Sequence, residues 1–339
     1  QTPMKHIAAH IAATENPAAE DWTALMTAFC DDTLADDVKA GALADLQHTE
    51  ITGDMLAACA NYLLSQALPL DLPRSALDVC GTGGDKSKEN VKTFNISTAV
   101  AFVVAAGGVD VIKHGNRAVS SQSGSSDVLA ALNVPIATTE TEAQEVFHKH
   151  HLCFVAAPAF HPCLKSMAAA RRSFGKPTFF NLLGPLCNPA RVTRQVMGVF
   201  DKKYLRPVAE AARLLGKTDM MVLHSHDGLD EISIAAPTDI CRIQNGDIIA
   251  MTVSPEEAGI TPALLTALAG GDAAANAAIM REIFANPSGA CADIIAINAA
   301  AGFMTAGIDD SLKDGLVRAR DIMATQKALQ KLQQMAGMA

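Results

Sequence analysis

Apolar residues follow two different spacings along this chain. Over residues 1–70 they recur three and four positions apart, as at Trp22 and Met26, which is the spacing of an amphipathic helix. A proline-rich stretch ending at Pro73 then interrupts the pattern. We therefore expect residues 1–70 to form a small helical domain and residues 71–339 to form a larger one.

From residue 71 onward, short apolar runs alternate with helical patterns. We expect strands at residues 76–80, 109–112, 152–156, 192–200 and 219–224, and a peripheral β-pair at 240–242 and 248–253. Helical patterns lie between the strands, one of them over 161–174, and continue from 261 to the end. Gly184-Pro185 and Asn188-Pro189 predict a turn. The alternation predicts an α/β domain with a mostly parallel central sheet and helices on both faces.

Two polar loops follow the first two of these strands. Gly81-Thr82-Gly83-Gly84-Asp85 comes after the first, and its glycines allow successive backbone N–H groups to converge on an anion. The second strand leads into the cationic cluster Lys113 to Arg117 and a serine-rich loop at 120–126. Because the carboxyl ends of parallel strands share one edge of a sheet, both loops should face one phosphate site.

Other interpretations of the glycine loop depend on single residues. Gly84-Asp85-Lys86-Ser87 is similar to the end of a nucleotide-triphosphate P-loop, but that motif needs Gly directly before the Lys, and Asp85 stands there. A dinucleotide-binding fingerprint lacks its third glycine. On the loop alone, a tight turn without any ligand remains an alternative.

Adjacent carboxylates at the end of a strand suggest a metal site. Asp230-Glu231 follow an apolar strand and Gly228, and hard oxygen ligands of this kind suit Mg²⁺ that also holds a phosphate. A solvated acidic turn is the alternative. The histidines at 148–151 do not share one helix face, and His224-Ser225-His226 lacks a clear third ligand for zinc.

Composition narrows the possible partners. The 339 residues are 49% hydrophobic and 19% charged, which is ordinary for a folded globular protein. A formal net charge of −9 disfavours nucleic acid and anionic membranes, so local cations such as Lys113 and Arg117 should serve a small ligand. We expect neither nucleic acid nor a membrane as partner.

The cysteines and the apolar runs indicate the compartment. The eight cysteines form no C-x-x-C pair and mostly lie in apolar runs, which predicts free thiols in a reducing cytoplasm. No apolar stretch reaches about 18 residues, and the first twenty residues hold no signal-like apolar region. We expect a cytoplasmic protein.

Several separated motifs, in one order, resemble those of a known family. They are GTGGD at 81–85, NIST at 95–98, KHGNRAVSSQSGSSD at 113–127, TFFNLLGPLCNP at 178–189 and GLDEIS at 228–233. Together they are similar to the signature segments of the anthranilate phosphoribosyltransferases, enzymes of tryptophan biosynthesis. The resemblance is clear from about residue 78 to residue 233.

This resemblance implies an activity, a cofactor and an assembly. The enzyme would be a pentosyltransferase that moves the phosphoribosyl group of 5-phosphoribosyl 1-pyrophosphate to the amino group of anthranilate, with Mg²⁺, and releases pyrophosphate. No covalent nucleophile is required, because the reaction passes through an oxocarbenium-like state that needs positioning and charge stabilisation. The resemblance also implies a homodimer through the helical domain, and a helix near 161–180 that returns to that domain.

The resemblance further assigns site residues. Those for phosphoribosyl pyrophosphate are Gly81, Gly83, Gly84, Asp85, Thr93, Asn95, Ser97, Thr98, Lys113, Asn116, Arg117, Ser121 and Ser125. Those for anthranilate are Gly81, His114, Asn116, Arg171, Gly184 and Pro185. Those for the metal are Ser97, Asp230 and Glu231. Arg171 is reached by counting back from residues 178–181, and its guanidinium suits a carboxylate.

The chain departs from the family pattern in two places, and two alternatives stay open. Seven residues, 86–92, stand where the family commonly has a shorter loop, and Pro177 replaces a common arginine. A pyrimidine nucleoside phosphorylase would share the architecture, but Arg171 and Gly184-Pro185 favour an aromatic acid as acceptor. A non-enzymatic nucleic-acid-binding relative should have lost Asp230-Glu231 and gained a basic surface.

Overall fold

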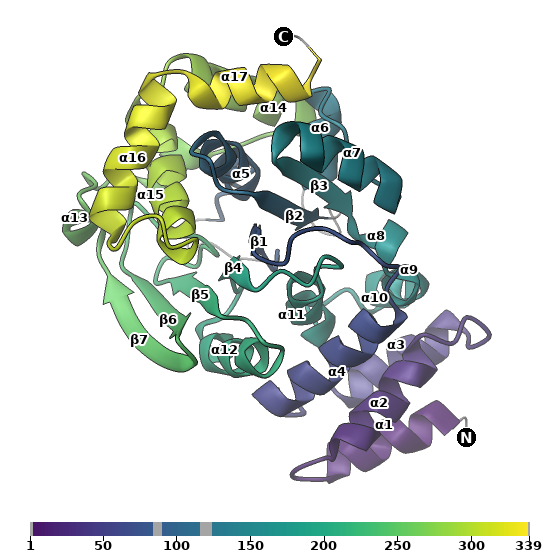
Figure 1. Ribbon diagram of the computed structural model, residues 1–339. Coiled ribbons are helices and arrows are strands. Elements are labelled where there is room, and N and C mark those ends of the chain that lie inside the picture. The colour runs from purple at the N-terminus through teal and green to yellow at the C-terminus, as the bar shows by residue number, and fades with distance from the viewer. Residues whose placement is uncertain (1–2, 84–89, 116–123, 338–339) are drawn as a thin grey trace.

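A computed structural model describes residues 3–83, 90–115 and 124–337 of the chain. Four helices come first and gather at one end of the molecule, beside the N-terminus (Figure 1). They are α1 (Pro3–Ala13), α2 (Ala19–Phe29), α3 (Asp36–Asp45) and α4 (Gly53–Gln66). Their apolar faces form a core that continues into one face of the sheet described next. The division of the chain at residue 70 stays a prediction.

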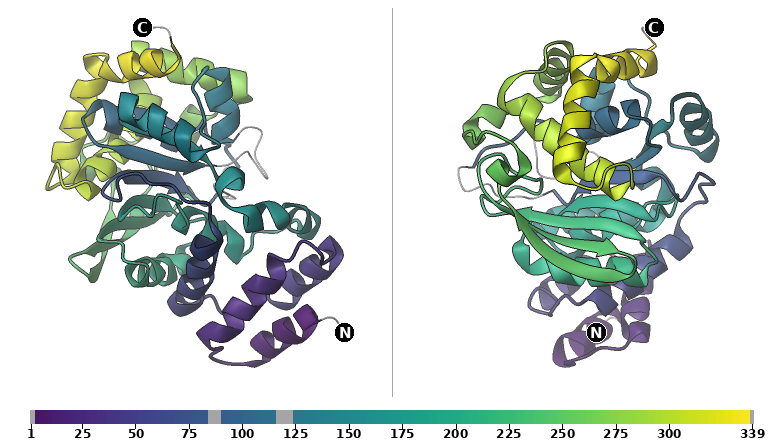
Figure 2. Two further views of the ribbon diagram at one scale, coloured as in Figure 1. Left: turned by 45° about the vertical axis from the view of Figure 1, so that its right-hand side comes forward. Right: turned by 60° about the vertical axis from the view of Figure 1, so that its left-hand side comes forward.

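One seven-stranded sheet forms the centre of the rest of the chain (Figure 2). Its strands are β1 (Leu77–Gly81), β2 (Val111–Gly115), β3 (Leu152–Ala156), β4 (Arg194–Gly198), β5 (Asp219–Ser225), β6 (Thr238–Gln244) and β7 (Asp247–Val253). Their order is β3-β2-β1-β4-β5-β6-β7; the first five strands in this order pair in parallel, and β6 and β7 are antiparallel. The predicted mostly parallel sheet with a peripheral β-pair is confirmed.

Helices cover both faces of this sheet. One face carries α5 (Ile96–Ala106), α6 (Ser125–Ala131), α14 (Ala273–Ala285), α15 (Gly289–Thr305), α16 (Leu312–Ala324) and α17 (Lys327–Met335). The other carries α4, α11 (Phe179–Leu186) and α12 (Leu205–Leu214), and α7 (Glu140–His150) lies beside β3. The short helices are α8 (Ala157–Phe160), α9 (Pro162–Ser166), α10 (Ala168–Phe174) and α13 (Pro255–Ala258), with 3₁₀ turns at Lys202–Tyr204 (η1) and Leu265–Leu268 (η2).

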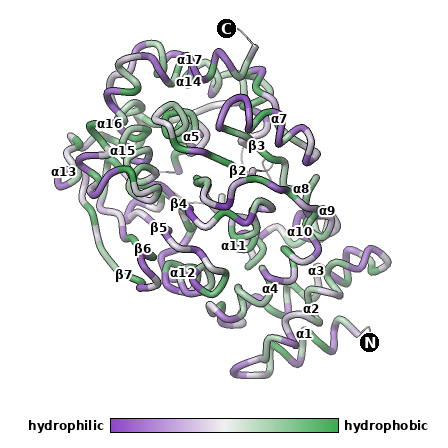
Figure 3. Tube along the Cα trace, viewed as in Figure 1, coloured by the Kyte–Doolittle hydropathy of each residue, from purple (hydrophilic) through white to green (hydrophobic). Residues whose placement is uncertain are grey.

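Apolar composition explains which helices lie deepest. Helix α5 is buried at nine of its eleven positions, and the hydrophobic colour of α5 and α15 in Figure 3 marks them as core helices. A helix that is apolar all round must be covered on all sides. Among the described residues no single helix is long and apolar enough to cross a membrane. The bent pair α14 and α15 reaches that length and composition only together.

The segment between β3 and β4 differs from its prediction. The single helix expected over 161–174 is divided at Met167 into α9 and α10, and Met167 itself keeps right-handed helical angles (φ −84°, ψ −8°). His161 is non-helical (φ −122°, ψ 87°) before Pro162, which separates α9 from α8. Gly184-Pro185, expected in a turn, lies in the last turn of α11. Because Pro185 has no N–H, it cannot donate to the carbonyl of Asn181 four residues earlier.

The N-terminal helices contact the segment between β3 and β4 through aromatic packing and a disulfide. The Phe29 ring in α2 lies 5.3 Å from the Phe180 ring, edge-on, and 6.3 Å from that of Phe179. Next to it, Cys30 is bonded to Cys163 of α9. The prediction that all eight cysteines are free is therefore wrong for this pair, which lies far apart in sequence and is joined only by folding. The other six are free thiols.

Candidate active site

The two polar loops begin side by side at one edge of the sheet. Strands β1 and β2 are parallel neighbours, so the glycine loop after Gly81 and the cationic loop after Gly115 leave from the same edge. Gly83 has φ +64°, a left-handed conformation that favours glycine. Thr82 N–H donates to the carbonyl of Gly198 (3.0 Å), which holds the loop against β4. The two loops therefore begin at a common edge, as predicted, and their facing of one phosphate site stays a prediction because residues 84–89 and 116–123 lie outside the described residues.

A buried cation and a serine meet beneath these loops. Lys113 in β2 is 4% exposed, and its Nζ donates to the Val79 carbonyl and to Ser97 Oγ (3.1 Å). Ser97 lies in the first turn of α5, whose N-terminus favours negative charge. The arrangement therefore offers an ammonium and a helix N-terminus to one anion.

Four further residues assigned to the phosphate ligand flank this point. Thr93 bridges to Ala269, and Asn95 is the N-cap of α5, where its Oδ1 accepts from Asn276 Nδ2 (2.9 Å). Thr98 Oγ1 is buried without a hydrogen-bond partner in the described part of the chain. A Cβ placed on Gly115 would lie 2.6 Å from Ser125 Oγ, so Ser125 sits against the end of β2.

Five of the assigned residues lie outside the part of the chain that the structure describes. Gly84, Asp85, Asn116, Arg117 and Ser121 lie outside the described residues, as do residues 86–89 of the longer loop. Their assignment stays a prediction.

The three residues assigned to the metal line one small cavity. Ser97, Asp230 and Glu231 border a space of about 20 Å³, together with Gly198, Asn298 and apolar side chains from β1, α5, β4 and β5. That volume suits a single water or ion. Carboxylate and hydroxyl oxygens are the donors that Mg²⁺ prefers, so the residues present fit this ion.

Two glycines allow the acidic residue to come this close. A Cβ on Gly81 would overlap the Asp230 carboxylate, and a Cβ on Gly198 would overlap the Asp230 carbonyl oxygen. Gly81 was predicted as a site residue, whereas Gly198 was missed. Its signal in the sequence was a glycine closing an apolar strand.

Buried side chains hold the loop that carries Asp230 and Glu231, the acidic loop, from both sides. Asp227 accepts from Leu229 N–H (3.2 Å) and from the Ser233 hydroxyl. Asn298 in α15 accepts from Ile232 N–H (2.8 Å) and donates to the Ile232 carbonyl (2.9 Å). Sequence reasoning missed Asn298, although an amide within the apolar run 294–304 was a signal.

The region assigned to anthranilate contains two buried histidines. His114 follows Lys113 in β2 and hydrogen-bonds to the Gly184 backbone. Its ring stands edge-on to that of His161, 5.2 Å away. Burial lowers the pKa of His114 well below its usual value, with His161 as a second cause, and burial also lowers the pKa of His161. Both imidazoles are therefore neutral at pH 7. His161 was not predicted.

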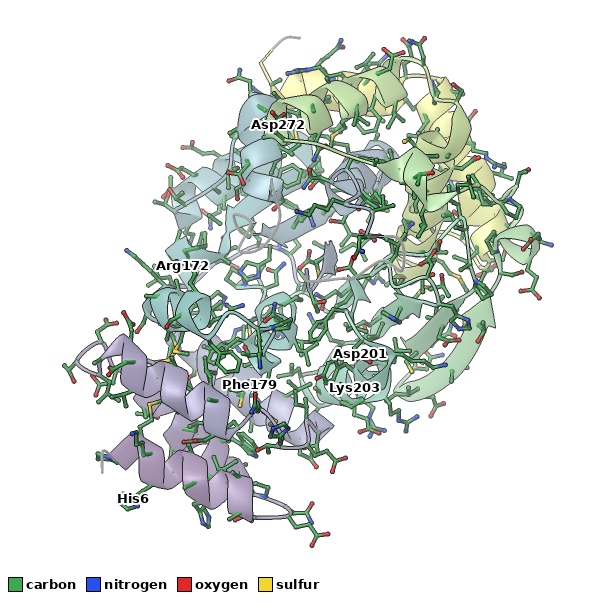
Figure 4. The ribbon with its side chains drawn as sticks, turned by 180° about the vertical axis from the view of Figure 1, so that it is seen from behind. His6, Arg172, Phe179, Asp201, Lys203 and Asp272 are labelled. Atoms are coloured by element: carbon green, nitrogen blue, oxygen red, sulfur yellow. A yellow bond between two sulfur atoms is a disulfide. The ribbon has the colours of Figure 1, made fainter. Side chains whose placement is uncertain are left out.

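Arg171 lies at the helical side of this region. Its Nη2 donates to Asn181 Oδ1 (3.5 Å), and its guanidinium carbon lies 5.7 Å from the centre of the Phe180 ring. Burial lowers its pKa, but a guanidinium stays charged in proteins. The neighbouring Arg172 is exposed (Figure 4).

The other histidine candidates have separate partners. His226 Nε2 pairs with Asp239 (2.9 Å), and His224 Nδ1 hydrogen-bonds to the Val199 carbonyl (2.7 Å). A larger groove of about 820 Å³ borders Phe179 and Lys203, both labelled in Figure 4, and of the predicted site residues that the structure describes none lines it.

Comparison with known proteins decides the family. The sequence profile described as "Glycosyl transferase family, a/b domain" matches residues 73–329. The anthranilate phosphoribosyltransferase of Nitrobacter hamburgensis is 41% identical over 295 residues, 87% of this chain and 86% of its own length. The chain belongs to the anthranilate phosphoribosyltransferase family. Another anthranilate phosphoribosyltransferase, from Alkaliphilus metalliredigens, is 40% identical over 94% of this chain and 93% of its own.

Solved anthranilate phosphoribosyltransferases have the same fold. The enzyme from Thermus thermophilus superimposes with a TM-score of 0.88 at 36% identity, covering 98% of each chain. The enzyme from Saccharomyces cerevisiae in complex with PRPP and Mg gives 0.87 at 25% identity, over 99% of this chain and 97% of that one. The family and fold predicted from the motifs are confirmed.

Proposed function

We propose that this chain transfers the phosphoribosyl group of 5-phosphoribosyl 1-pyrophosphate to the amino group of anthranilate and releases pyrophosphate. This is the pentosyltransferase reaction of its family, a step of tryptophan biosynthesis. The observation that carries the proposal is the convergence of the Lys113 ammonium, the α5 N-terminus and the Asp230-Glu231 pair at one edge of the sheet. The two alternatives, a nucleoside phosphorylase and a non-enzymatic relative, have no comparable support.

The donor side binds charge. Lys113 and the N–H groups of the glycine loop hold the pyrophosphate, and the N-terminal turn of α5 adds its positive end. The predicted donor residues that the structure describes are Gly81, Gly83, Thr93, Asn95, Ser97, Thr98, Lys113 and Ser125. As the glycosidic bond breaks, these groups stabilise the charge that collects on the departing pyrophosphate.

Ser97, Asp230 and Glu231 would hold Mg²⁺, the ion named with the yeast relative. When bound, Mg²⁺ neutralises charge on pyrophosphate oxygens.

The acceptor side positions a neutral aromatic amine. Arg171 pairs with the carboxylate of anthranilate, and Gly184-Pro185 form the wall against its ring. Neutral His114 adds no second cation to this region, so the carboxylate is directed to Arg171 and the amine toward the donor. Alignment of this weak nucleophile is the main contribution of these residues to the rate.

The assembly and the compartment belong to the same proposal. We place the enzyme in the cytoplasm as a homodimer that associates through helices α1–α4. In a reducing compartment Cys30 and Cys163 would be thiols. The packing of Phe29 against Phe180 then holds α2 to this segment without the covalent bond.

Anthranilate fluorescence tests the proposed reaction directly. We expect the signal to fall only when both 5-phosphoribosyl 1-pyrophosphate and Mg²⁺ are present, with pyrophosphate appearing in equal amount. Omitting each component in turn is the control. Consumption of anthranilate that continues in excess chelator would contradict the metal role, and no consumption in the complete mixture would contradict the reaction.

Replacing Arg171 by Ala tests the acceptor side. Loss of a charge-assisted hydrogen bond costs roughly 1.5 to 3 kcal/mol, which raises the Michaelis constant for anthranilate about ten- to a hundredfold. The constant for the phosphate donor should change little. Arg172→Ala is the matched control, because Arg172 is the exposed neighbour in the same helix. If the two variants have the same Michaelis constant for anthranilate, Arg171 does not bind the acceptor.

A further inference from the structure

Helix α11 ends in a way that leaves one carbonyl without a backbone donor. The helix ends at Leu186, so the carbonyl of Pro185 is one of the terminal carbonyls that have no donor within the helix, and the residue four positions later, Pro189, has no N–H. The end of this helix is buried, with Leu186 and Cys187 both under 3% exposed. A buried carbonyl without a donor is costly, so some other group must supply the hydrogen bond.

Gln195 in β4 supplies it. Its Nε2 donates to the Pro185 carbonyl (2.7 Å), and its side chain is fully buried. The same nitrogen lies 3.2 Å from Cys80 Sγ, in the residue directly before Gly81. One amide therefore contacts both the end of α11 and the end of β1.

Two neighbouring side chains hold the same helix end. His161 Nε2 hydrogen-bonds to the Cys187 carbonyl (2.6 Å), and Asn188 Nδ2 donates to Asp78 (3.0 Å) and to the Ile112 carbonyl (2.9 Å). These contacts fix residues 187 and 188. Of Gln195, His161 and Asn188, Gln195 is the one that bonds to Pro185 itself.

We propose that Gln195 is a positioning residue for the acceptor. It does not touch substrate; through the Pro185 carbonyl it sets the separation between the acceptor wall and the glycine loop at Gly81. That separation places the amine against the reacting carbon, where small displacements reduce the rate strongly. The inference rests on the proposed function, because it takes Gly184-Pro185 as that wall.

The test replaces Gln195 by Met, which has similar length and no hydrogen-bond donor. We expect the Michaelis constant for anthranilate to rise about tenfold, while that for the phosphate donor changes less than about twofold. Calorimetric titration with anthranilate, without the phosphate donor so that no turnover occurs, should show the same weakening.

Arg194→Met is the matched control. Arg194 precedes Gln195 in β4, and its Nη1 donates to the Ala306 carbonyl (3.0 Å) on the opposite side of the sheet. It should destabilise the protein to a similar extent without changing the ratio of the two Michaelis constants. If both variants shift that ratio equally, or neither shifts it, Gln195 is a structural residue and the inference is wrong.

Gln195→Asn serves if the Met variant does not fold. It keeps an amide in the buried position but shortens its reach by one methylene, so the same selective rise is expected and its absence overturns the inference. Titration of the wild type distinguishes a failure of the proposed function from a failure of the role proposed for Gln195. Failure of the wild type to bind anthranilate contradicts the proposed function, whereas equal binding by wild type and variant contradicts only the role of Gln195.

Discussion

Changing Asp230 to Asn and Glu231 to Gln together should lower kcat/KM for the phosphate donor by about a hundredfold or more. Both carboxylates border the small cavity beside Ser97, and removal of one preorganised electrostatic group of this kind costs about 10² to 10³ in rate. The apparent affinity for Mg²⁺ should fall as well. The Michaelis constant for anthranilate should stay nearly constant, because Arg171 and His114 are unchanged.

The free energy of unfolding distinguishes a specific loss of activity from a general destabilisation of the fold. The substitutions remove two adjacent negative charges in a largely buried loop, so the free energy of unfolding should be unchanged or higher. Glu256-Glu257 at the start of α13 is an acidic pair elsewhere, and Glu256→Gln with Glu257→Gln is the control. Comparable activity of the two double variants would mean that Asp230 and Glu231 do not serve the donor.

Gly198→Ala should disable the site by a steric effect. A Cβ at this position overlaps the backbone carbonyl of Asp230, and no side-chain rotation can relieve a contact with backbone. The acidic loop must move, and a displacement of about 1 Å can cost on the order of a hundredfold in rate. Overpacking should also lower the free energy of unfolding by about 1 to 3 kcal/mol.

Gly41→Ala provides the comparison. Gly41 lies in α3 with no atom within 4 Å of an added Cβ, so alanine should stabilise the helix by about 0.5 to 1 kcal/mol. Urea unfolding and donor kinetics of both variants separate the two effects. A Gly198→Ala enzyme with full activity would show that the Asp230 loop does not need its close position against β4.

Local patterns carried much of the prediction. The strand at 152–156 was predicted at its observed bounds, and the strand–loop–helix order around Gly81 and Lys113 follows from neighbouring residues alone. Because parallel strands end at a common edge, the common edge from which these loops begin could be predicted without coordinates. The motifs then predicted site roles for Asp230, Glu231 and Arg171.

The misses share another origin. The helix predicted over 161–174 is divided at Met167, although the helical spacing of apolar residues continues on both sides of it. The Cys30–Cys163 pair joins residues separated by 133 positions. Such contacts depend on how α2 packs on α9, which no local spacing encodes.

The sequence by itself determined the chemistry of the loops and the alternation that makes a parallel sheet, since both depend on residues close together in the chain. Only the tertiary structure decided which distant side chains support that chemistry. Gly198 makes room for Asp230, Asn298 holds Ile232 from α15, and Gln195 donates to the Pro185 carbonyl at the end of α11. Each of these roles depends on the backbone or carbonyl of another segment that packing brings within contact distance, and a polar or small residue within an apolar run was its only trace in the sequence.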